Sequence, residues 1–224
     1  MSKQLNSQLH LQVLNINEIG PARWQRWQDL LSEEEADRAG RYRQAVDRKS
    51  FVAGRGVVRE LAAAAAGVPE STISIGTTAR GKPFIEGMQE IFQFSISHSA
   101  EYLAILWHQR PESVGVDIEK LRADFDYDGV VHHYFSEKER QQIQSAADFF
   151  KLWTRKEALL KALGTGLVDE LKGVEVHERI VQGSDPVMEF MTLLSEKVVL
   201  SCAIPQGLPH PQSSFHPEKF NLVP

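Results

Sequence analysis

Apolar residues alternate with polar ones along parts of this 224-residue chain and recur at helical spacing along others. Alternation and short apolar runs predict strands, whereas apolar residues three or four positions apart predict helices. Strands are expected at residues 9–16, 72–75, 91–97, 102–108, 114–119, 173–180, 188–194 and 197–204. Helices are expected at residues 22–31 and 149–163 and directly after positions 32, 47 and 136. The elements come mixed, without a regular βαβ order, so we expect the α+β class.

Residues that favour helix starts and stops predict where the expected helices begin and end. Ser32 followed by Glu35 has the spacing of a capping box. Asp47 and Asp148 are expected to be the N-caps of the two longest helices, since aspartate is a favoured N-cap residue. Glycine commonly follows the last turn of a helix. The glycines expected to end the two long helices are Gly67 and Gly164.

The chain is expected to form two halves, at residues 1–112 and 113–204, each with a few strands and a long helix. The proline-rich tail at 205–224 either wraps the surface or is disordered. With 42% hydrophobic and 25% charged residues, the composition is that of an ordinary soluble domain. There is no apolar run of about 18 residues, and a single cysteine, Cys202, suggests a buried thiol in a reducing setting. We therefore expect a cytoplasmic protein.

The charge is unevenly distributed. The net charge of −5 argues against a nucleic-acid partner. Residues 37–60, however, contain seven basic and three acidic side chains. This stretch suits a polyanionic ligand, and a solvated helix face is the alternative.

Two acids share one face of the strand expected at 114–119. Side chains alternate across a strand, so Asp117 and Glu119 point the same way, beside Gly115, which leaves room for something to approach. Neighbouring carboxylates repel each other unless one is protonated or a cation lies between them. Oxygen ligands favour Mg²⁺ first and Mn²⁺ second. The pattern allows a metal site, although such a pair on its own is more often a strand end with solvated acids.

Charged residues interrupt the apolar stripe of the helix expected at 149–163. Lys156 falls in the middle of the stripe, Glu157 lies at its margin, and Lys161 follows Glu157 on the same side. A lysine among apolar neighbours is costly unless its ammonium reaches water or an anion. In the functional interpretation, both lysines reach phosphate oxygens while Glu157 turns to the metal. In the alternative, Lys156 extends along its own stem to water.

Small hydroxyls surround one histidine in Ser97-His98-Ser99, at the end of an expected strand. Adjacent strand residues face opposite sides, so Ser97 and His98 are poorly placed to be a nucleophile and its base. A phosphate pocket is a better use of these groups, and a structural histidine is the alternative.

Three stretches in order resemble the signatures of the Sfp-type 4′-phosphopantetheinyl transferases: SISHS at 95–99, GVDIE at 115–119 and WTRKEALLK at 153–161. GKP at 81–83 and GTGL at 164–167 add to the resemblance, which covers residues 32–170. Ser95 is a departure, because the family usually has asparagine there. The resemblance implies a monomer of two pseudo-symmetric α/β halves with coenzyme A bound between them.

The resemblance also implies roles for individual residues. Glu139, in FSEKE at 135–139, would be the general base, directly or through a water, and Glu157 and Lys161 complete the catalytic set. The implied ligands of magnesium, or of manganese, are Asp117, Glu119 and Glu157. The implied contacts of coenzyme A are Arg38, Lys82, Ser97, His98, Lys156 and Lys161.

The implied reaction transfers 4′-phosphopantetheine from coenzyme A to a serine hydroxyl of an apo acyl or peptidyl carrier protein. Adenosine 3′,5′-bisphosphate is released, as in a holo-[acyl-carrier-protein] synthase. Such a protein would serve fatty acid, polyketide or nonribosomal peptide biosynthesis, with no nucleic-acid or membrane partner. The alternatives are a relative that binds coenzyme A or a carrier without transfer, a metal-dependent nucleotide pyrophosphatase, and a purely structural role for the lysine-bearing helix.

Overall fold

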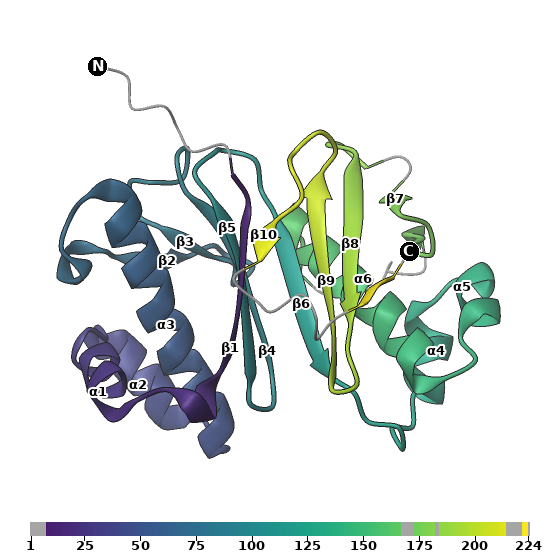
Figure 1. Cartoon of the computed structure of the whole chain (residues 1–224), viewed down its shortest axis with the longest axis horizontal. Coiled ribbons are helices and arrows are strands. Elements are labelled where there is room, and N and C mark those ends of the chain that lie inside the picture. The colour runs from purple at the N-terminus through teal and green to yellow at the C-terminus, as the bar shows by residue number, and fades with distance from the viewer. Residues whose placement is uncertain (1–7, 167–172, 182–183, 214–220, 224) are drawn as a thin grey trace.

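The computed structural model describes residues 8–166, 173–181, 184–213 and 221–223, and Figure 1 shows two halves side by side. Each half contains a mainly antiparallel sheet with one long helix beside it. Helices and strands are mixed along the chain, so the α+β class expected from the sequence is confirmed. None of the helices in the described ranges has both the length and the apolar character that crossing a bilayer requires.

The first sheet has the strand order β10-β1-β5-β4, and the second has the order β11-β8-β9-β6 with β7 also paired to β8. The strands of the first sheet are β1 (His10–Asn15), β4 (Gln93–Ser99), β5 (Tyr102–His108) and β10 (Gln212–Ser213). Those of the second are β6 (Gly115–Lys120), β7 (Ile180–Val181), β8 (Met188–Leu194), β9 (Val198–Pro205) and β11 (Asn221–Val223). A short hairpin of β2 (Ile75–Thr77) and β3 (Pro83–Ile85) completes the set.

The helices are distributed evenly between the halves. The first half contains α1 (Pro21–Asp29), α2 (Glu33–Arg41) and α3 (Ala45–Ala66), with 3₁₀ turns at Ile16–Glu18 and Glu70–Thr72. The second contains α4 (Asp128–Tyr134), α5 (Glu137–Gln142) and α6 (Ala146–Leu163). Both long helices, α3 and α6, end on a glycine of positive φ, as expected from the sequence.

Gly115 lets α6 lie directly against the second sheet. A Cβ added at this position would lie 1.8 Å from the Ala158 carbonyl oxygen of α6, so only glycine fits there. The sequence suggested that this glycine leaves space for something to approach, and the structure identifies that neighbour as the backbone of α6. Helix and strand carry different parts of the candidate site, so their close approach brings those parts together.

The two sheets meet along their inner edge strands, β4 and β6. No hydrogen-bonded ladder joins these two described strands, and serine side chains of β4 bridge them instead. Ser95 accepts a hydrogen bond from the Val116 amide, and Ser97 donates to Asp117 at 2.6 Å. Ser99 donates to Glu119 at 2.7 Å and accepts from the Lys120 amide. We call these three residues the serine seam; through it the first half holds two of the candidate metal ligands of the second.

Asp47 and Asp148 are not N-caps, so that expectation is wrong for both. Helix α3 begins at Ala45, and α6 begins at Ala146 after Ser145, whose side chain accepts from the Asp148 amide. Each aspartate occupies the third position of its helix, where its carboxylate faces the positive end of the helix dipole. The capping box from Ser32 to Glu35 is confirmed.

Two expected strands are mostly wrong. Residues 72–75 begin as a 3₁₀ turn, and residues 173–180 contribute only the start of β7. Side chains of α6 explain the second case, because Lys156 donates to the Val174 carbonyl and Arg155 to the carbonyls of Val176 and His177. Backbone groups bound in this way are not available to a sheet. The sequence also gave no signal for β3 or α4.

The tail beyond Pro205 partly follows the surface-wrap alternative. Strand β10 adds to the outer edge of the first sheet beside β1, and β11 adds to the outer edge of the second beside β8. Residues 214–220 and 224 lie outside the described residues.

Candidate functional site

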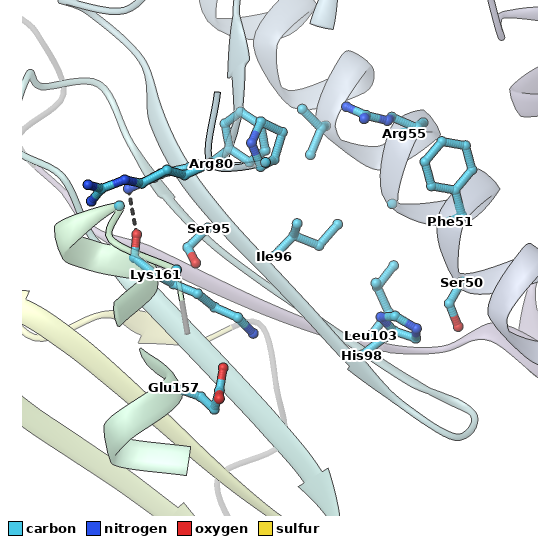
Figure 2. A pocket seen from close by; sticks show the side chains of 18 of the residues that line it. Ser50, Phe51, Arg55, Arg80, Ser95, Ile96, His98, Leu103, Glu157 and Lys161 are labelled. Carbon is cyan, nitrogen blue, oxygen red and sulfur yellow. Dashed lines mark hydrogen bonds between the residues drawn. The ribbon is translucent and has the colours of Figure 1, made fainter. Parts of the chain in front are cut away.

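A cavity of about 350 Å³ lies where α2, α3 and β4 of the first half face α6 of the second. Figure 2 shows Glu157 and Lys161 projecting from α6 toward the strand that carries Ser95, Ile96 and His98. On the far side, Phe51 and Arg55 extend from α3. The long helices of both halves therefore supply opposite walls of one cavity.

The walls are strongly basic. One carboxylate, Glu157, is the single acid among the described residues that line the cavity. The basic residues that line it are Arg38, Arg55, Arg80, Lys82, His98 and Lys161. Such an excess of cations in a partly enclosed space favours an anionic ligand.

Part of the cavity wall next to α3 is apolar and aromatic. Two guanidinium groups lie near the Phe51 ring, with the Arg38 and Arg55 Cζ atoms each 5.2 Å from the ring centroid. Phe94, Ile96 and Leu103 extend this apolar surface. A ligand with both charged and uncharged parts would find matching surfaces here.

The carboxylates of β6 lie at the boundary between the halves. Asp117 is buried, and its Oδ1 accepts hydrogen bonds from Ser97 and from the Lys161 ammonium, each at 2.6 Å. Glu119 accepts from Ser99. Lys161 also donates to Ser97 at 2.8 Å, so this lysine is linked to both β4 and β6.

Glu157 lies close enough to Asp117 and Glu119 to feel their charge. Burial and these two carboxylates raise the pKa of Glu157 to about 7, while Lys161 opposes the shift. Burial and Asp117 also raise the pKa of Glu119. The three predicted metal ligands thus share one electrostatic environment.

A cation would fit the chemistry of this acid group. Asp117 Oδ2 and Glu157 Oε1 are buried oxygens with no hydrogen-bond partner, and an unpaired buried oxygen is costly. In the described ranges, no three His, Cys, Asp or Glu side chains are gathered closely enough to form a ready-made metal shell. The ligand set of Asp117, Glu119 and Glu157 therefore stays a prediction that the two unpartnered oxygens favour.

Lys82, expected to contact coenzyme A, is engaged with the end of α6. Its ammonium donates to the carbonyls of Lys161 at 2.7 Å and of Ala162 at 3.3 Å, and to the Ser113 hydroxyl. Burial lowers the pKa of Lys82 to about 8. Lysine at a helix C-terminus satisfies carbonyls that the helix leaves unpaired. Lys82 still lines the cavity, but these hydrogen bonds join the two halves.

Ser97 and His98 point to opposite sides of β4, as strand geometry predicts. Ser97 turns toward Asp117, whereas His98 lines the cavity. The imidazole Nε2 lies 3.9 Å from an Asp47 oxygen, and burial lowers the pKa of His98. Of the two, only His98 is placed to touch a ligand in the cavity.

Glu139 and Lys156 do not line the cavity. The Lys156 ammonium lies 2.9 Å from Glu139 Oε2, and neither side chain has any exposed surface. Their expected roles, as general base and as ligand of coenzyme A, have no support from this placement. The sequence could not locate them, because an apolar stripe shows that a lysine is buried without showing its partner.

The sequence interpretation assigned no individual role to several residues of the cavity wall. Phe51, Arg55 and Arg80 are the main ones. Arg55 belongs to the basic stretch at 37–60, and Arg80 directly precedes the GKP turn, so each had a signal nearby. Which basic residue of a helix faces a cavity depends on packing that the sequence does not state.

Comparison with known proteins assigns the family. Residues 113–189 match the family model of the 4′-phosphopantetheinyl transferase superfamily, and residues 20–109 match that of the 4′-phosphopantetheinyl transferase N-terminal region. The 4′-phosphopantetheinyl transferase HetI of Nostoc sp. is 32% identical over 160 residues, which are 66% of this chain and 67% of HetI. The chain belongs to the 4′-phosphopantetheinyl transferase superfamily.

Other members of the superfamily are similar over a comparable region. The L-aminoadipate-semialdehyde dehydrogenase-phosphopantetheinyl transferase of Homo sapiens is 32% identical over 163 residues, 65% of this chain and 52% of the human protein. The 4′-phosphopantetheinyl transferase of Bacillus subtilis is 29% identical over 144 residues, 61% of this chain and 62% of its own. The matched regions thus span only half to two thirds of these relatives. The narrower Sfp type stays a prediction.

Proposed function

We propose that this protein transfers the 4′-phosphopantetheine group of coenzyme A to a serine hydroxyl of an apo carrier protein. The observation that carries the proposal is the basic cavity between the halves, in which Glu157 is the acid among the described lining residues and lies beside the acids of β6. Membership of the superfamily supports the same reaction.

Coenzyme A suits both surfaces of the cavity. The guanidinium groups of Arg38, Arg55 and Arg80 would bind its phosphates, together with His98 and Lys161. The apolar surface that includes Phe94 would accept uncharged parts of the ligand. In this proposal Lys82 and Ser97 hold Lys161 and Asp117 in place from the first half.

Asp117, Glu119 and Glu157 would hold a divalent cation, with magnesium preferred over manganese. When bound, this cation would neutralise charge on the pyrophosphate of coenzyme A. The two unpartnered oxygens of Asp117 and Glu157 support this assignment.

The transfer requires a nucleophile, a proton acceptor and a stabilised leaving group. The oxygen of the carrier serine forms a bond to the phosphorus that bears pantetheine, and the bond from that phosphorus to the bridging oxygen breaks. Glu157 takes the proton of the attacking hydroxyl, directly or through a water, because its carboxylate lines the cavity where the ligand would bind. Lys161 stabilises the adenosine 3′,5′-bisphosphate that leaves. Glu139, the base expected from the sequence, has no exposed surface for this task.

The test is intact-mass spectrometry of several apo carrier proteins after incubation with the protein, coenzyme A and Mg²⁺. The expected result is a mass gain of one phosphopantetheine on at least one carrier, and no gain on a carrier whose acceptor serine is replaced by alanine. Binding of coenzyme A without mass gain on any carrier would favour a non-catalytic relative. Hydrolysis of nucleotides without consumption of coenzyme A would favour a pyrophosphatase.

A further inference from the structure

Glu139 and Lys156 form part of a fully bonded buried cluster. Glu139 Oε2 accepts from the Ser136 amide at 2.9 Å as well as from Lys156, and Oε1 accepts from the Val176 amide at 2.8 Å. Lys156 also donates to the Val174 carbonyl at 2.6 Å. The cluster therefore joins three parts of the second half: the start of α5, the middle of α6, and the segment at 174–176.

The first half contains the same arrangement. Glu35 Oε2 accepts from the Ser32 amide at 3.0 Å and from the Arg59 guanidinium at 2.7 Å. Arg59 also donates to the Ile73 carbonyl at 3.2 Å. One buried acid and one buried base again join three parts of a half. These parts are the start of a short helix, the middle of a long helix and the segment that follows the long helix.

The correspondence holds for one carboxylate oxygen of each acid; the other oxygen differs, since Glu139 Oε1 accepts from the Val176 amide whereas Glu35 Oε1 lies 3.3 Å from the Arg55 guanidinium. Both acids are the third residue of a short helix and complete its capping box, from Ser32 to Glu35 and from Ser136 to Glu139. In each case the oxygen that accepts from the N-cap amide also accepts from the base of the long helix. The sequence carries the repeat as LSEEE at 31–35 and FSEKE at 135–139.

The repetition identifies what the arrangement does. The candidate metal ligands Asp117, Glu119 and Glu157 all belong to the second half, so the pair in the first half has no part in their chemistry. An arrangement present in both halves has a function that both share, which is to fix a long helix against its short neighbour. We call each pair a capping-box staple: Glu35 with Arg59 in α3, and Glu139 with Lys156 in α6.

We propose that Glu139 and Lys156 are positioning residues, which set the orientation of α6 so that Glu157 and Lys161 face the cavity. This proposal rests on the proposed function. Successive helix residues point about 100° apart, so anchoring Lys156 also directs its neighbours. Arg155 adds a second anchor, donating to Thr192 at 2.9 Å and to two backbone carbonyls. With two consecutive residues bonded to the protein interior, Glu157 is directed to the cavity.

The test compares three variants in each half: Glu139→Gln, Lys156→Gln and their double, and Glu35→Gln, Arg59→Gln and their double. Thermal unfolding midpoints are measured for all of them. Rates of carrier modification are then measured well below those midpoints, with kcat and the KM for coenzyme A determined separately. Lys138→Gln is the control, because the exposed pair of Lys138 with Glu175 joins the same two segments of the second half at the surface.

Each single variant of the second half should lower the midpoint by about 10 °C, since it leaves one buried charge unpaired. In the first half Arg59→Gln should cost less, because Arg55 still lies 3.3 Å from Glu35. In the second half, the singles should lower kcat at least tenfold with less than a twofold change in KM, and the neutral double should recover most of both losses. In the first half, whose helices carry Arg38 and Arg55, the single variants should instead raise the KM for coenzyme A. Lys138→Gln should change nothing measurable, as is usual for an exposed pair.

Three results would overturn the proposal. A double variant in the second half that keeps its midpoint but stays at least a hundredfold slow would make Glu139 the base. A rise in KM with an unchanged midpoint in Lys156→Gln would make this lysine a ligand of coenzyme A. Unchanged kcat in folded but destabilised single variants would reduce the staple to a purely structural pair.

If the double variant of Glu139 and Lys156 fails to fold, Arg155→Met still tests the positioning role. Arg155 anchors the same part of α6 and has no role in the transfer. It should lower kcat and leave KM unchanged; an unaffected kcat would contradict positioning. Failure of the wild-type protein to modify any carrier would instead refute the proposed function, and the midpoints would still report whether each pair is coupled.

Discussion

The two long helices, α3 and α6, have similar positions in their halves and contribute differently to the cavity. Both begin with an aspartate in the first turn, carry the base of a capping-box staple, and end on a glycine of positive φ. Helix α3 presents Phe51, Gly54 and Arg55 to the cavity, whereas α6 presents Glu157 and Lys161. In the proposed function, one scaffold thus supports a wall that binds the ligand in the first half, the binding wall, and a wall that carries the chemistry in the second, the chemical wall.

The largest expected effect is loss of transfer on altering the predicted metal ligands. Glu157→Gln and Asp117→Asn should each reduce kcat on the order of 10²-fold or more, because each removes a charge that the transition state needs. Carrier modification followed by mass spectrometry measures this. Glu137→Gln, at an exposed acid of α5, is the control and should keep full activity. Retained activity in the Glu157 or Asp117 variants would refute the proposed metal site.

Matched glycine substitutions compare how rigidly each helix is held. Gly115→Ala should lower the free energy of unfolding by about 3 kcal/mol or more, because the new methyl group would meet the Ala158 backbone at 1.8 Å. Gly54→Ala would meet only the tip of the Ile96 side chain, at 2.5 Å. Its cost should stay within about 1 kcal/mol, since alanine also improves helix propensity. Urea unfolding measures both, and equal losses would contradict the comparison.

Altering the binding wall should change affinity and leave the chemistry intact. Arg38→Ala should raise the KM for coenzyme A by about tenfold with kcat nearly unchanged, because it removes a cation that contacts bound and reacting ligand alike. Arg41, an exposed arginine of the same helix that does not line the cavity, supplies the control Arg41→Ala. Equal effects of the two substitutions would mean that general charge, and not the cavity, attracts the ligand.

The smallest expected effect is on stability and depends on pH. Because the pKa of Glu157 rises from 4.5 to about 7 on folding, the folded state binds its proton more tightly than the unfolded state. The free energy of unfolding should therefore fall between pH 4.5 and pH 7, and Glu157→Gln should remove this fall. With EDTA present, the unfolding midpoint of the variant should exceed that of the wild type by a few degrees (~3 °C) at pH 8 and match it at pH 4. Equal midpoints at pH 8 would mean that the charge of Glu157 costs no stability.

Sequence patterns predicted most of the fold and the acids of the site. Strand alternation placed Asp117 and Glu119 on one face, and the Gly67 and Gly164 stops were confirmed. The start of each long helix was predicted less well, because aspartate is favourable both as an N-cap and in the first turn. Asp47 and Asp148 were expected as N-caps, but each is the third residue of its helix.

What the sequence could not supply is the partner of each buried charge. Lys156 was correctly recognised as a lysine among apolar neighbours, but its anion is Glu139 of the protein itself and not a ligand phosphate. The repeat of LSEEE as FSEKE was a signal that Glu139 belongs to a motif also present in the half without the predicted metal ligands. Residues 173–180 were misjudged for a related reason, because side chains of α6 occupy their backbone groups.

The serine seam has a consequence for how the halves can move. Backbone ladders break cooperatively, whereas three separate hydroxyls can each rotate and exchange one partner for another. Removal of one serine should therefore weaken the junction only in part, because buried apolar side chains of both sheets, such as Leu106 and Val116, also belong to one hydrophobic cluster. Asp117 and Glu119 accept two of these serine hydrogen bonds. A ligand that binds their carboxylate oxygens would therefore compete with contacts that connect the two halves.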